Sequence, residues 1–231
     1  MTELINPRIG KFTASKIYLL LKGGTRPATK QELEQFKAAK SKRTTVDTMF
    51  GDTALKYIRE KVAETLIGET ISDSQETSSK ATEWGLINEY HAIEAYSLKH
   101  GVEVHSRQVF LPYGEHAGAT PDGLVGEDGM IEVKCPWNPS EHVNNILMTD
   151  EQFIKYHEDY YPQMQMQLLC SGREWVDFVS FDPRVVNEAA RLHVRRFYRD
   201  EPLIEELRTR IAAATDIKLE MLKEVARKCG G

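Results

Sequence analysis

The chain has 231 residues, of which 41% are hydrophobic and 28% charged, values typical of a folded globular protein. No apolar run is long enough to cross a membrane, and we expect no signal peptide. Three scattered cysteines, Cys135, Cys170 and Cys229, argue against a disulfide framework, a zinc knuckle or an iron–sulfur cluster. A cytoplasmic protein is therefore expected.

The net charge of −5 is unevenly distributed. Residues 1–43 contain ten basic and three acidic residues, a local charge of +7, and the remainder carries −12. An acidic body with a basic N-terminal part suits a protein that holds phosphates at one place. A solvated helix face around Lys37, Lys40, Lys42 and Arg43 would explain the same charges equally well.

The N-terminal half predicts helices more clearly than strands. Residues 22–48 are polar and basic, and predict a loop that contains a short helix at 30–41. Apolar residues recur at helical spacing from 52 to 67, and Gly68 ends that pattern. After a polar loop at 72–82, a second helix is predicted at 83–99, followed by strand-like residues at 102–111.

The C-terminal half begins with a predicted β-hairpin. Strand-like runs at 119–125 and 130–135 flank a tetrapeptide bounded by two glycines. The later elements are a loop-rich connection, a helix at 160–171, a strand at 175–181, and helices at 185–199 and 201–228. The pattern predicts an α/β (α+β) fold in a single domain over 1–231, with a helical C-terminal extension from about 185 to 231.

The predicted hairpin brings three chemically distinctive residues together. Asp122 precedes the turn and Glu132 follows it, so a turn centred on residues 127 and 128 places them nearly opposite each other. Lys134 is two residues beyond Glu132 and shares its face of the strand. Two carboxylates about 4 Å apart repel by roughly 4 kcal/mol at an effective dielectric of 20. Such a pair suits Mg²⁺ or Mn²⁺, with Lys134 holding or activating a water. Alternatively, the carboxylates simply face solvent.

Other candidate residues lie on the predicted helices and near the N-terminus. Glu89 lies on an apolar helix face, so it is expected either to pair with a basic residue or to help bind a metal. Gln165 could orient a water, or it could be a boundary glutamine bonded to backbone. Arg8, Thr13 and Ser15 precede a predicted helix and form a natural phosphate cradle, although Thr13 or Ser15 could equally be an ordinary helix cap.

Taken in order, five short motifs resemble the lambda exonuclease family of phage recombination nucleases, also called YqaJ-like viral recombinases, within the PD-(D/E)xK class. They are R-x-G-x-x-T-A-S, W-G-x-x-x-E, P-D-G-L, E-x-K-C-P and Q-x-Q. With a further match at Asp182-Pro183-Arg184, the resemblance extends from Arg8 to Arg184. The resemblance implies a restriction-endonuclease-like core, with a central mixed sheet flanked by helices.

The same resemblance implies roles for individual residues. It implies Mg²⁺ bound by Asp122, Glu132 and the carbonyl of Val133, with Glu89 contributing to a second metal or its shell. Lys134 is similar to the family's catalytic lysine, and Gln165 to its water-positioning glutamine. The residues matched to the 5′-phosphate site are Arg8, Ser15 and Thr120, and Lys80 falls where the family has a basic residue near the active site.

The activity implied is digestion of one strand of linear double-stranded DNA from its 5′ end, leaving a 3′ overhang. A single-strand annealing protein is the expected partner, and a homo-oligomer, often a ring-shaped trimer around DNA, the expected assembly. A phage or prophage origin in a bacterial host is expected. Thr120 stands where lambda exonuclease has serine. A site-specific or structure-specific endonuclease, or a non-catalytic DNA-binding module, remains an alternative.

Overall fold

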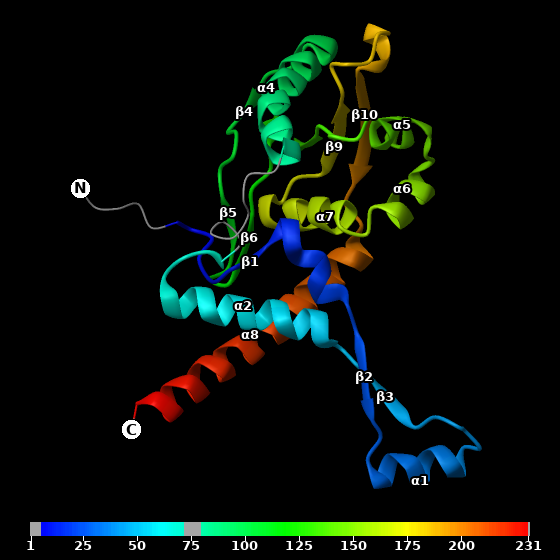
Figure 1. Ribbon diagram of the computed structural model, residues 1–231, viewed down its shortest axis with the longest axis vertical. Helices are drawn as coiled ribbons and strands as arrows, with labels where there is room; N and C mark the ends of the chain where they lie inside the picture. Colours follow the sequence, from blue (N-terminus) through cyan, green and yellow to red (C-terminus); the bar gives the residue numbers. More distant parts are fainter. Residues whose placement is uncertain (1–5, 72–79, 231) are drawn as a thin grey trace.

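A five-stranded mixed sheet forms the centre of the computed structural model, which describes residues 6–71 and 80–230 (Figure 1). Its strands lie in the order β10–β9–β8–β7–β4, and only the pair β8 and β9 is parallel. The bounds are β4 (Val104–His105), β7 (Gly123–Val125), β8 (Gly129–Lys134), β9 (Trp175–Phe181) and β10 (Leu192–Tyr198). The predicted mixed sheet is confirmed.

Helices cover both faces of this sheet. On one face, α4 (Lys80–His100) buries Ala92, Ile93 and Tyr96 against the odd-numbered side chains of β8. On the other face lies α7 (Tyr160–Ser171), preceded by α5 (Pro139–Leu147) and α6 (Asp150–Tyr156). Strand periodicity separates the two cores, because successive side chains point to opposite faces. Glu132 and Lys134 therefore face the α7 side.

A third core packs against the far side of α7. It is formed by a small sheet, β1 (Phe12–Thr13), β6 (Ala117–Ala119) and β5 (Leu111–Tyr113), together with η1 (Ala14–Leu21), α2 (Asp52–Ile67) and α8 (Glu201–Cys229). Met164 and Leu168 of α7 belong to the core between α7 and the five-stranded sheet, whereas Met166 and Leu169 belong to this third core. As a result, α7 is enclosed on all sides, and each polar side chain on it needs an internal partner.

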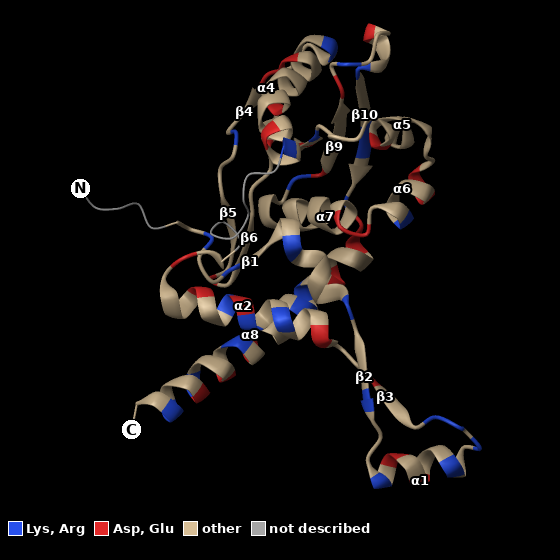
Figure 2. Cartoon of the chain, viewed as in Figure 1, with Lys and Arg blue, Asp and Glu red and all other residues tan. Residues whose placement is uncertain are grey.

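An arm projects from this body. It consists of β2 (Gly24–Pro27), α1 (Lys30–Ala38) and β3 (Thr45–Thr48) (Figure 1). Among the strands of the described residues, β2 and β3 pair only with each other. No residue of α1 is buried. Lysine and arginine residues lie along the arm and its tip (Figure 2). The sequence predicts the basic segment at 22–48 as a loop that contains a short helix. The structure instead contains a two-stranded ribbon that carries the short helix.

Several elements lie where the sequence predicts them. α2, α7 and β9 match the predicted ranges, and α1 ends three residues earlier than predicted. α4 begins at Lys80, inside the segment predicted as a loop; positions 72–79 of that segment lie outside the described residues. In the described part of the chain, no helix combines the length and apolarity needed to cross a membrane.

The predicted helix at 185–199 is wrong. The segment contains a short 3-10 helix, η2 (Glu188–Ala190), and the edge strand β10. β10 forms seven antiparallel pairs with β9 and buries Leu192 on one face of the sheet and Phe197 on the other. That alternation outweighs the helical preference of the arginines, and the helical C-terminal extension begins only at Glu201. The connection after Pro136, predicted as loop-rich, contains α5 and α6.

Candidate active site

The β7–β8 hairpin fixes the central carboxylate pair. Gly123 pairs with Ile131 and Leu124 with Met130, so one further step places Asp122 opposite Glu132, as predicted. β7 begins only at Gly123, so no β7 residue pairs with Val133 of β8. The Asp122 side chain supplies the hydrogen-bond acceptor instead. The Val133 N–H donates to Oδ2 of Asp122 at 2.6 Å. Because the N–H and C=O of one strand residue point to the same edge, the Val133 carbonyl faces the same side as Asp122.

Glu132 is buried, with 2% of its surface exposed, and its oxygens accept three side-chain hydrogen bonds. Lys134 Nζ and Gln163 Nε2 donate to Oε1, each at 2.6 Å, and Gln167 Nε2 donates to Oε2 at 2.6 Å. Burial of a carboxylate is costly unless such donors replace water. The three donors therefore hold Glu132 in a fixed orientation at the end of β8.

Lys134 lies between the carboxylates and an aromatic ring. Its ammonium contacts Glu132 at 2.6 Å and lies 4.7 Å from the centre of the Tyr160 ring. Burial alone would lower the pKa of Lys134, but the charges of Glu132 and Asp122 outweigh that effect, and the pKa is raised. Lys134 is thus held as a cation that donates hydrogen bonds.

The surroundings of the Asp122 carboxyl disfavour its ionised form. Burial raises its pKa well above the usual value, and the nearby charge of Glu132 raises it further. The Lys134 charge and the Val133 N–H oppose this shift only in part. A carboxyl in such surroundings takes up either a proton or a cation.

Next to Lys134, burial also raises the pKa of the Cys135 thiol to about 12, so this cysteine is not a ready thiolate ligand.

Glu89 of α4 approaches the pair from the other face of the sheet. Its charge contributes to the raised pKa of Asp122, which places it in the same electrostatic environment. The predicted inward position is only partly correct, because Leu86 on the same face is 65% exposed and Glu89 itself is half-buried. Its Oε1 accepts a hydrogen bond from Gln108 Nε2 at 3.0 Å. Glu89 thus lies at the rim rather than inside the core.

The structure places Gln165 away from the carboxylates, contrary to the water-positioning role expected for it. Gln165 Nε2 donates to the Tyr198 carbonyl at 3.0 Å, and its Oε1 accepts the Asp200 N–H at 2.8 Å. The alternative, a glutamine bonded to backbone, is what the structure contains. Gln163 and Gln167 occupy the face toward Glu132 because they are four residues apart, whereas Gln165 points to the opposite side of the helix. That i, i+4 pair is the sequence signal that was missed.

The residues expected to hold a 5′-phosphate lie on the N-terminal segment and on β6. β1 and β6 are parallel, with Phe12 beside Ala117 and Thr13 beside Gly118. Ser15 follows in the first turn of η1, and Thr120 is the residue after β6. Thr120 precedes Pro121 and Asp122, which joins this region to the carboxylate pair. Thr13 is the first residue before η1, but its side chain caps no N–H; its Oγ1 lies 3.4 Å from Ser15 Oγ.

The basic residues of the expected cradle are both exposed. Arg8 lies in a turn that precedes Gly10, and the Gly10 N–H donates to the buried Glu64 while its carbonyl accepts from the buried Lys218. These two bonds anchor the turn that carries Arg8. Lys80 lies in the first turn of α4, more than two helical turns before Glu89, so no close grouping with the carboxylates is evident.

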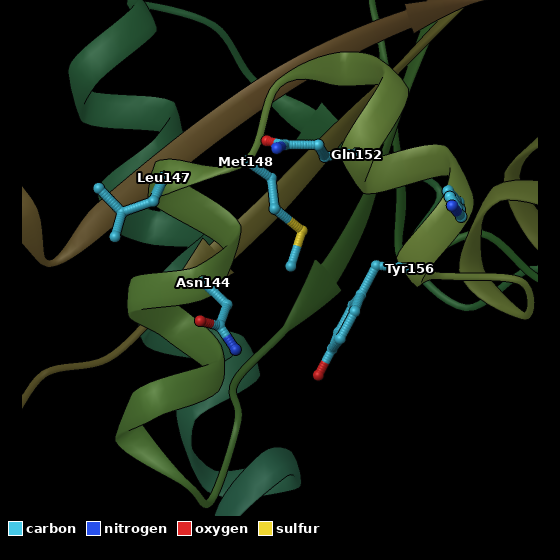
Figure 3. Close-up of a pocket in the computed structure, with 6 residues that line it drawn as sticks. Asn144, Leu147, Met148, Gln152 and Tyr156 are labelled. Carbon is cyan, nitrogen blue, oxygen red and sulfur yellow. The ribbon is translucent and has the colours of Figure 1, made fainter.

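Among the described residues, no three His, Cys, Asp or Glu side chains are gathered as a metal cluster. Hydrogen bonds already engage Asp122 and Glu132, and Glu89 is turned toward Gln108. A separate cavity of about 570 Å³ lies between α5 and α6, lined by Asn144, Leu147, Met148, Gln152, Lys155 and Tyr156 (Figure 3). It includes none of the predicted site residues.

With this geometry established, the family comparison is decisive. The model of the YqaJ-like viral recombinase domain matches residues 35–174, more than half of the chain. The chain belongs to this family. The matched YqaJ-like region contains Glu89, Asp122, Glu132 and Lys134, and the two glutamines that hold Glu132.

Solved structures agree with the YqaJ-like assignment. An alkaline exonuclease, LHK-Exo from Laribacter hongkongensis, is 28% identical with a TM-score of 0.74, and covers 100% of this chain and 98% of its own. The same exonuclease in complex with dAMP is 29% identical, with a TM-score of 0.73 and the same coverage. A phage-related exonuclease from Haemophilus somnus 129PT, 19% identical with a TM-score of 0.67 over 93% of this chain and 96% of its own, shares the fold. A search of curated proteins finds no match.

Proposed function

We propose that this protein is a Mg²⁺-dependent exonuclease that digests one strand of linear double-stranded DNA from its 5′ end and leaves a 3′ overhang. The observation that supports it most directly is the grouping of Asp122, Glu132 and Lys134 at the end of β8, in a chain of the YqaJ-like family. The full-length similarity to an alkaline exonuclease supports the same reaction class.

The donor chemistry at this point fits a hard divalent cation. Asp122 and Glu132 crowd two carboxylates together, and the raised pKa of Asp122 reflects that crowding. With the Val133 carbonyl, they supply only oxygen ligands, as Mg²⁺ and the substituting Mn²⁺ prefer. Glu89, at the rim, would serve a second ion or its shell. When bound, the cation supplies an activated water and offsets charge on the scissile phosphate.

The protein's own groups complete the proposed chemistry. Lys134 donates hydrogen bonds from a fixed position, where it can orient the attacking water and stabilise the charge that develops on the phosphate. Gln163 and Gln167 keep Glu132 in place without adding charge. Their role differs from the one expected of Gln165, because they position a carboxylate rather than a water.

Recognition of the strand end is assigned to the N-terminal segment. Arg8 offers a guanidinium, and Thr13 and Ser15 offer hydroxyls at the start of η1. Thr120 offers a third hydroxyl directly after β6, the strand that pairs with β1. A grip on a 5′-phosphate favours an exonuclease, because an endonuclease has no need to hold a strand end. As parts of the same proposal, the protein acts as a trimeric ring in the bacterial host of a phage or prophage and passes the overhang to a single-strand annealing protein.

The reaction is tested with linear duplex DNA labelled at either end, in Mg²⁺ and then with excess EDTA. Stepwise loss of the 5′ strand that requires the metal is the expected result. Discrete internal cuts would instead indicate an endonuclease, and binding without cleavage in Mg²⁺ or Mn²⁺ would indicate a DNA-binding module. Light scattering coupled to size-exclusion chromatography measures the oligomer, and a monomer at micromolar concentration would contradict the trimer.

Arg8→Ala is expected to reduce the preference for 5′-phosphorylated over 5′-hydroxyl ends, because it removes the guanidinium assigned to the phosphate. Loss of such a charge-assisted contact costs about 1.5–3 kcal/mol, or roughly 10- to 150-fold in relative rate. The ratio of initial rates on the two substrates is measured beside Arg59→Ala, which alters an exposed arginine of α2. An unchanged ratio for Arg8→Ala would remove Arg8 from the cradle.

A further inference from the structure

Three residues after Lys134, the chain presents a large aromatic side chain to solvent. Trp137 is 49% exposed, although indole is among the most favourable groups to bury. Three residues span at most roughly 10 Å of extended chain. Successive stacked bases along a DNA strand are about 3.4 Å apart. Trp137 therefore lies within a few nucleotides of the proposed reaction centre.

Neighbouring side chains hold the part of the Trp137 ring that is not exposed. Trp84 of α4 meets Trp137 edge to face, with 5.7 Å between the ring centres. The Arg184 guanidinium lies 4.3 Å from the Trp84 ring centre and 6.0 Å from that of Trp137. Trp84 and Arg184 thus support one side of the exposed indole.

Arg184 is itself fixed. It donates two hydrogen bonds at 2.8 Å to Asp182, whose surface is 0% exposed, and further bonds to the carbonyls of Pro136 and Trp137. The last bond ties the cation directly to the backbone that carries the exposed ring. Asp182 also belongs to the electrostatic surroundings of Cys135, together with Glu89, Asp122 and Lys134. The Trp84–Trp137–Arg184 cluster therefore borders the carboxylate site.

We propose that Trp137, supported by Trp84 and Arg184, is a stacking platform for an unpaired nucleobase of the DNA strand engaged at the Asp122–Lys134 site. The assignment rests on the proposed nuclease function. A base inside a duplex has both faces covered by its neighbours, whereas an end nucleotide or an overhang offers a free π-face. A rigid aromatic surface binds such a face with little loss of side-chain entropy.

The test pairs a protein change with a DNA change. Equilibrium binding is measured by fluorescence anisotropy in EDTA, with 5′-phosphorylated duplexes that carry one abasic residue at successive positions near the end of either strand. The proteins are wild type, Trp137→Ala, Trp137→Phe and the control Tyr198→Ala. Tyr198 is 64% exposed and pairs with Trp175, which pairs with Gly129 at the opposite end of β8 from Lys134.

For wild type, one abasic position is expected to weaken binding roughly 5- to 150-fold, the usual range for loss of one base–aromatic stack. Trp137→Ala should lose a similar factor on intact DNA and become insensitive to that position, whereas Trp137→Phe retains most of the affinity. Tyr198→Ala should behave as wild type. Circular dichroism confirms that each variant is folded, as expected for changes at exposed positions.

Two outcomes overturn the platform: Trp137→Ala binds intact DNA as tightly as wild type, or its losses simply add to the abasic losses at every position. Digestion of the same duplexes in Mg²⁺ separates this result from the proposed function. Wild-type digestion without Trp137 coupling rejects the platform and leaves the exonuclease intact. Coupling without digestion supports the platform and rejects the exonuclease.

Discussion

At the scale of single residues, the glutamines of α7 show how one buried helix serves two sides of the molecule. Gln163 and Gln167 reach Glu132, whereas Gln165 bonds the backbone around β10 and the start of α8. All three are buried, with 8% or less of their surface exposed. Identical chemistry at alternate positions therefore has different consequences, and these can be measured separately.

Replacement of Gln167 by Ala is expected to lower the proposed nuclease activity by roughly 10- to 100-fold, because second-sphere partners of a metal-binding carboxylate have effects of this size. Gln165→Ala should instead leave the Asp200 N–H and Tyr198 carbonyl unsatisfied and reduce the free energy of unfolding by about 1–3 kcal/mol. Urea unfolding and rates per folded molecule are measured for both. A larger rate loss for Gln165→Ala would reverse the assignment.

Lys134→Ala is expected to abolish most hydrolysis, with a loss of about 10²- to 10⁴-fold, because it removes the positioned cation beside the carboxylates. The lysine is partly exposed at the end of β8, so the fold should persist. Mg²⁺ or Mn²⁺ binding by calorimetry should remain, and Lys56→Ala on the exposed face of α2 is the control. Undiminished activity of Lys134→Ala would exclude the catalytic role.

At the scale of elements, a buried polar network joins α5, α7 and β9. His142 Nδ1 and Asn145 Nδ2 both approach the Ser180 hydroxyl, at 2.8 and 3.1 Å, and His157 Nε2 contacts Asn145 Oδ1 at 2.7 Å. His157 stacks on Tyr160, with 4.7 Å between the ring centres, and the Tyr160 ring faces Lys134. Ser180 pairs with Lys134 in the β8–β9 ladder, so the network borders the candidate site.

Burial lowers the pKa of His157 below 6.5, and Asp159 and Glu141 oppose that shift incompletely. Between the folded and unfolded pKa values, the unfolded chain binds more protons, so stability falls as the pH falls below about 6.5. The free energy of unfolding from urea titrations should therefore drop between pH 7.5 and 5.5. His157→Gln, which retains a donor for Asn145, should flatten this dependence.

The control for this prediction is His91→Gln, which changes a histidine on the exposed surface of α4. It should keep the wild-type slope of stability against pH. An equal slope for His157→Gln and wild type would mean that other groups cause the acid sensitivity.

The elements differ in how far the sequence could predict them. The β7–β8 hairpin and its carboxylate pair follow from a local turn and strict alternation, so Asp122 and Glu132 could be paired from sequence alone. β10 was missed because Arg195 and Arg196 obscure its alternation; their partners, Asp150 and Asp177, lie on distant segments. The face of α7 that meets Glu132 depends on packing between two cores, which local sequence does not encode.

At the scale of the whole molecule, the arm stands apart from the body. α1 has a capping box at Thr29 and Glu32, and Arg26 bonds both oxygens of Glu32 at 2.7 and 2.8 Å. These contacts lie within the arm, and the ribbon pairs only with itself. Contacts within the arm order it, but its sequence has no apolar periodicity of the kind that elements packed on a core show. Its basic composition therefore suggested a loop.

Limited trypsin digestion is expected to cut first at the arm tip, between Lys37 and Arg43, because α1 buries none of its residues and its opening disturbs no core. Mass spectrometry identifies the sites, and circular dichroism should show a folded body after cleavage. Lys61 and Lys218 in the body, 3% and 4% exposed, serve as internal controls. Initial cleavage at these body lysines would contradict an independent arm.

The position of Asp122 in place of a strand partner links function to heat tolerance. The same ladder that orders the central sheet also sets the distance between the two carboxylates. Warming cannot disperse them until β7 and β8 separate, and that separation opens the core itself. An enzyme whose catalytic residues lie on a loop that unfolds locally loses its activity before the whole protein melts. Here loss of activity and melting should occur as one cooperative event.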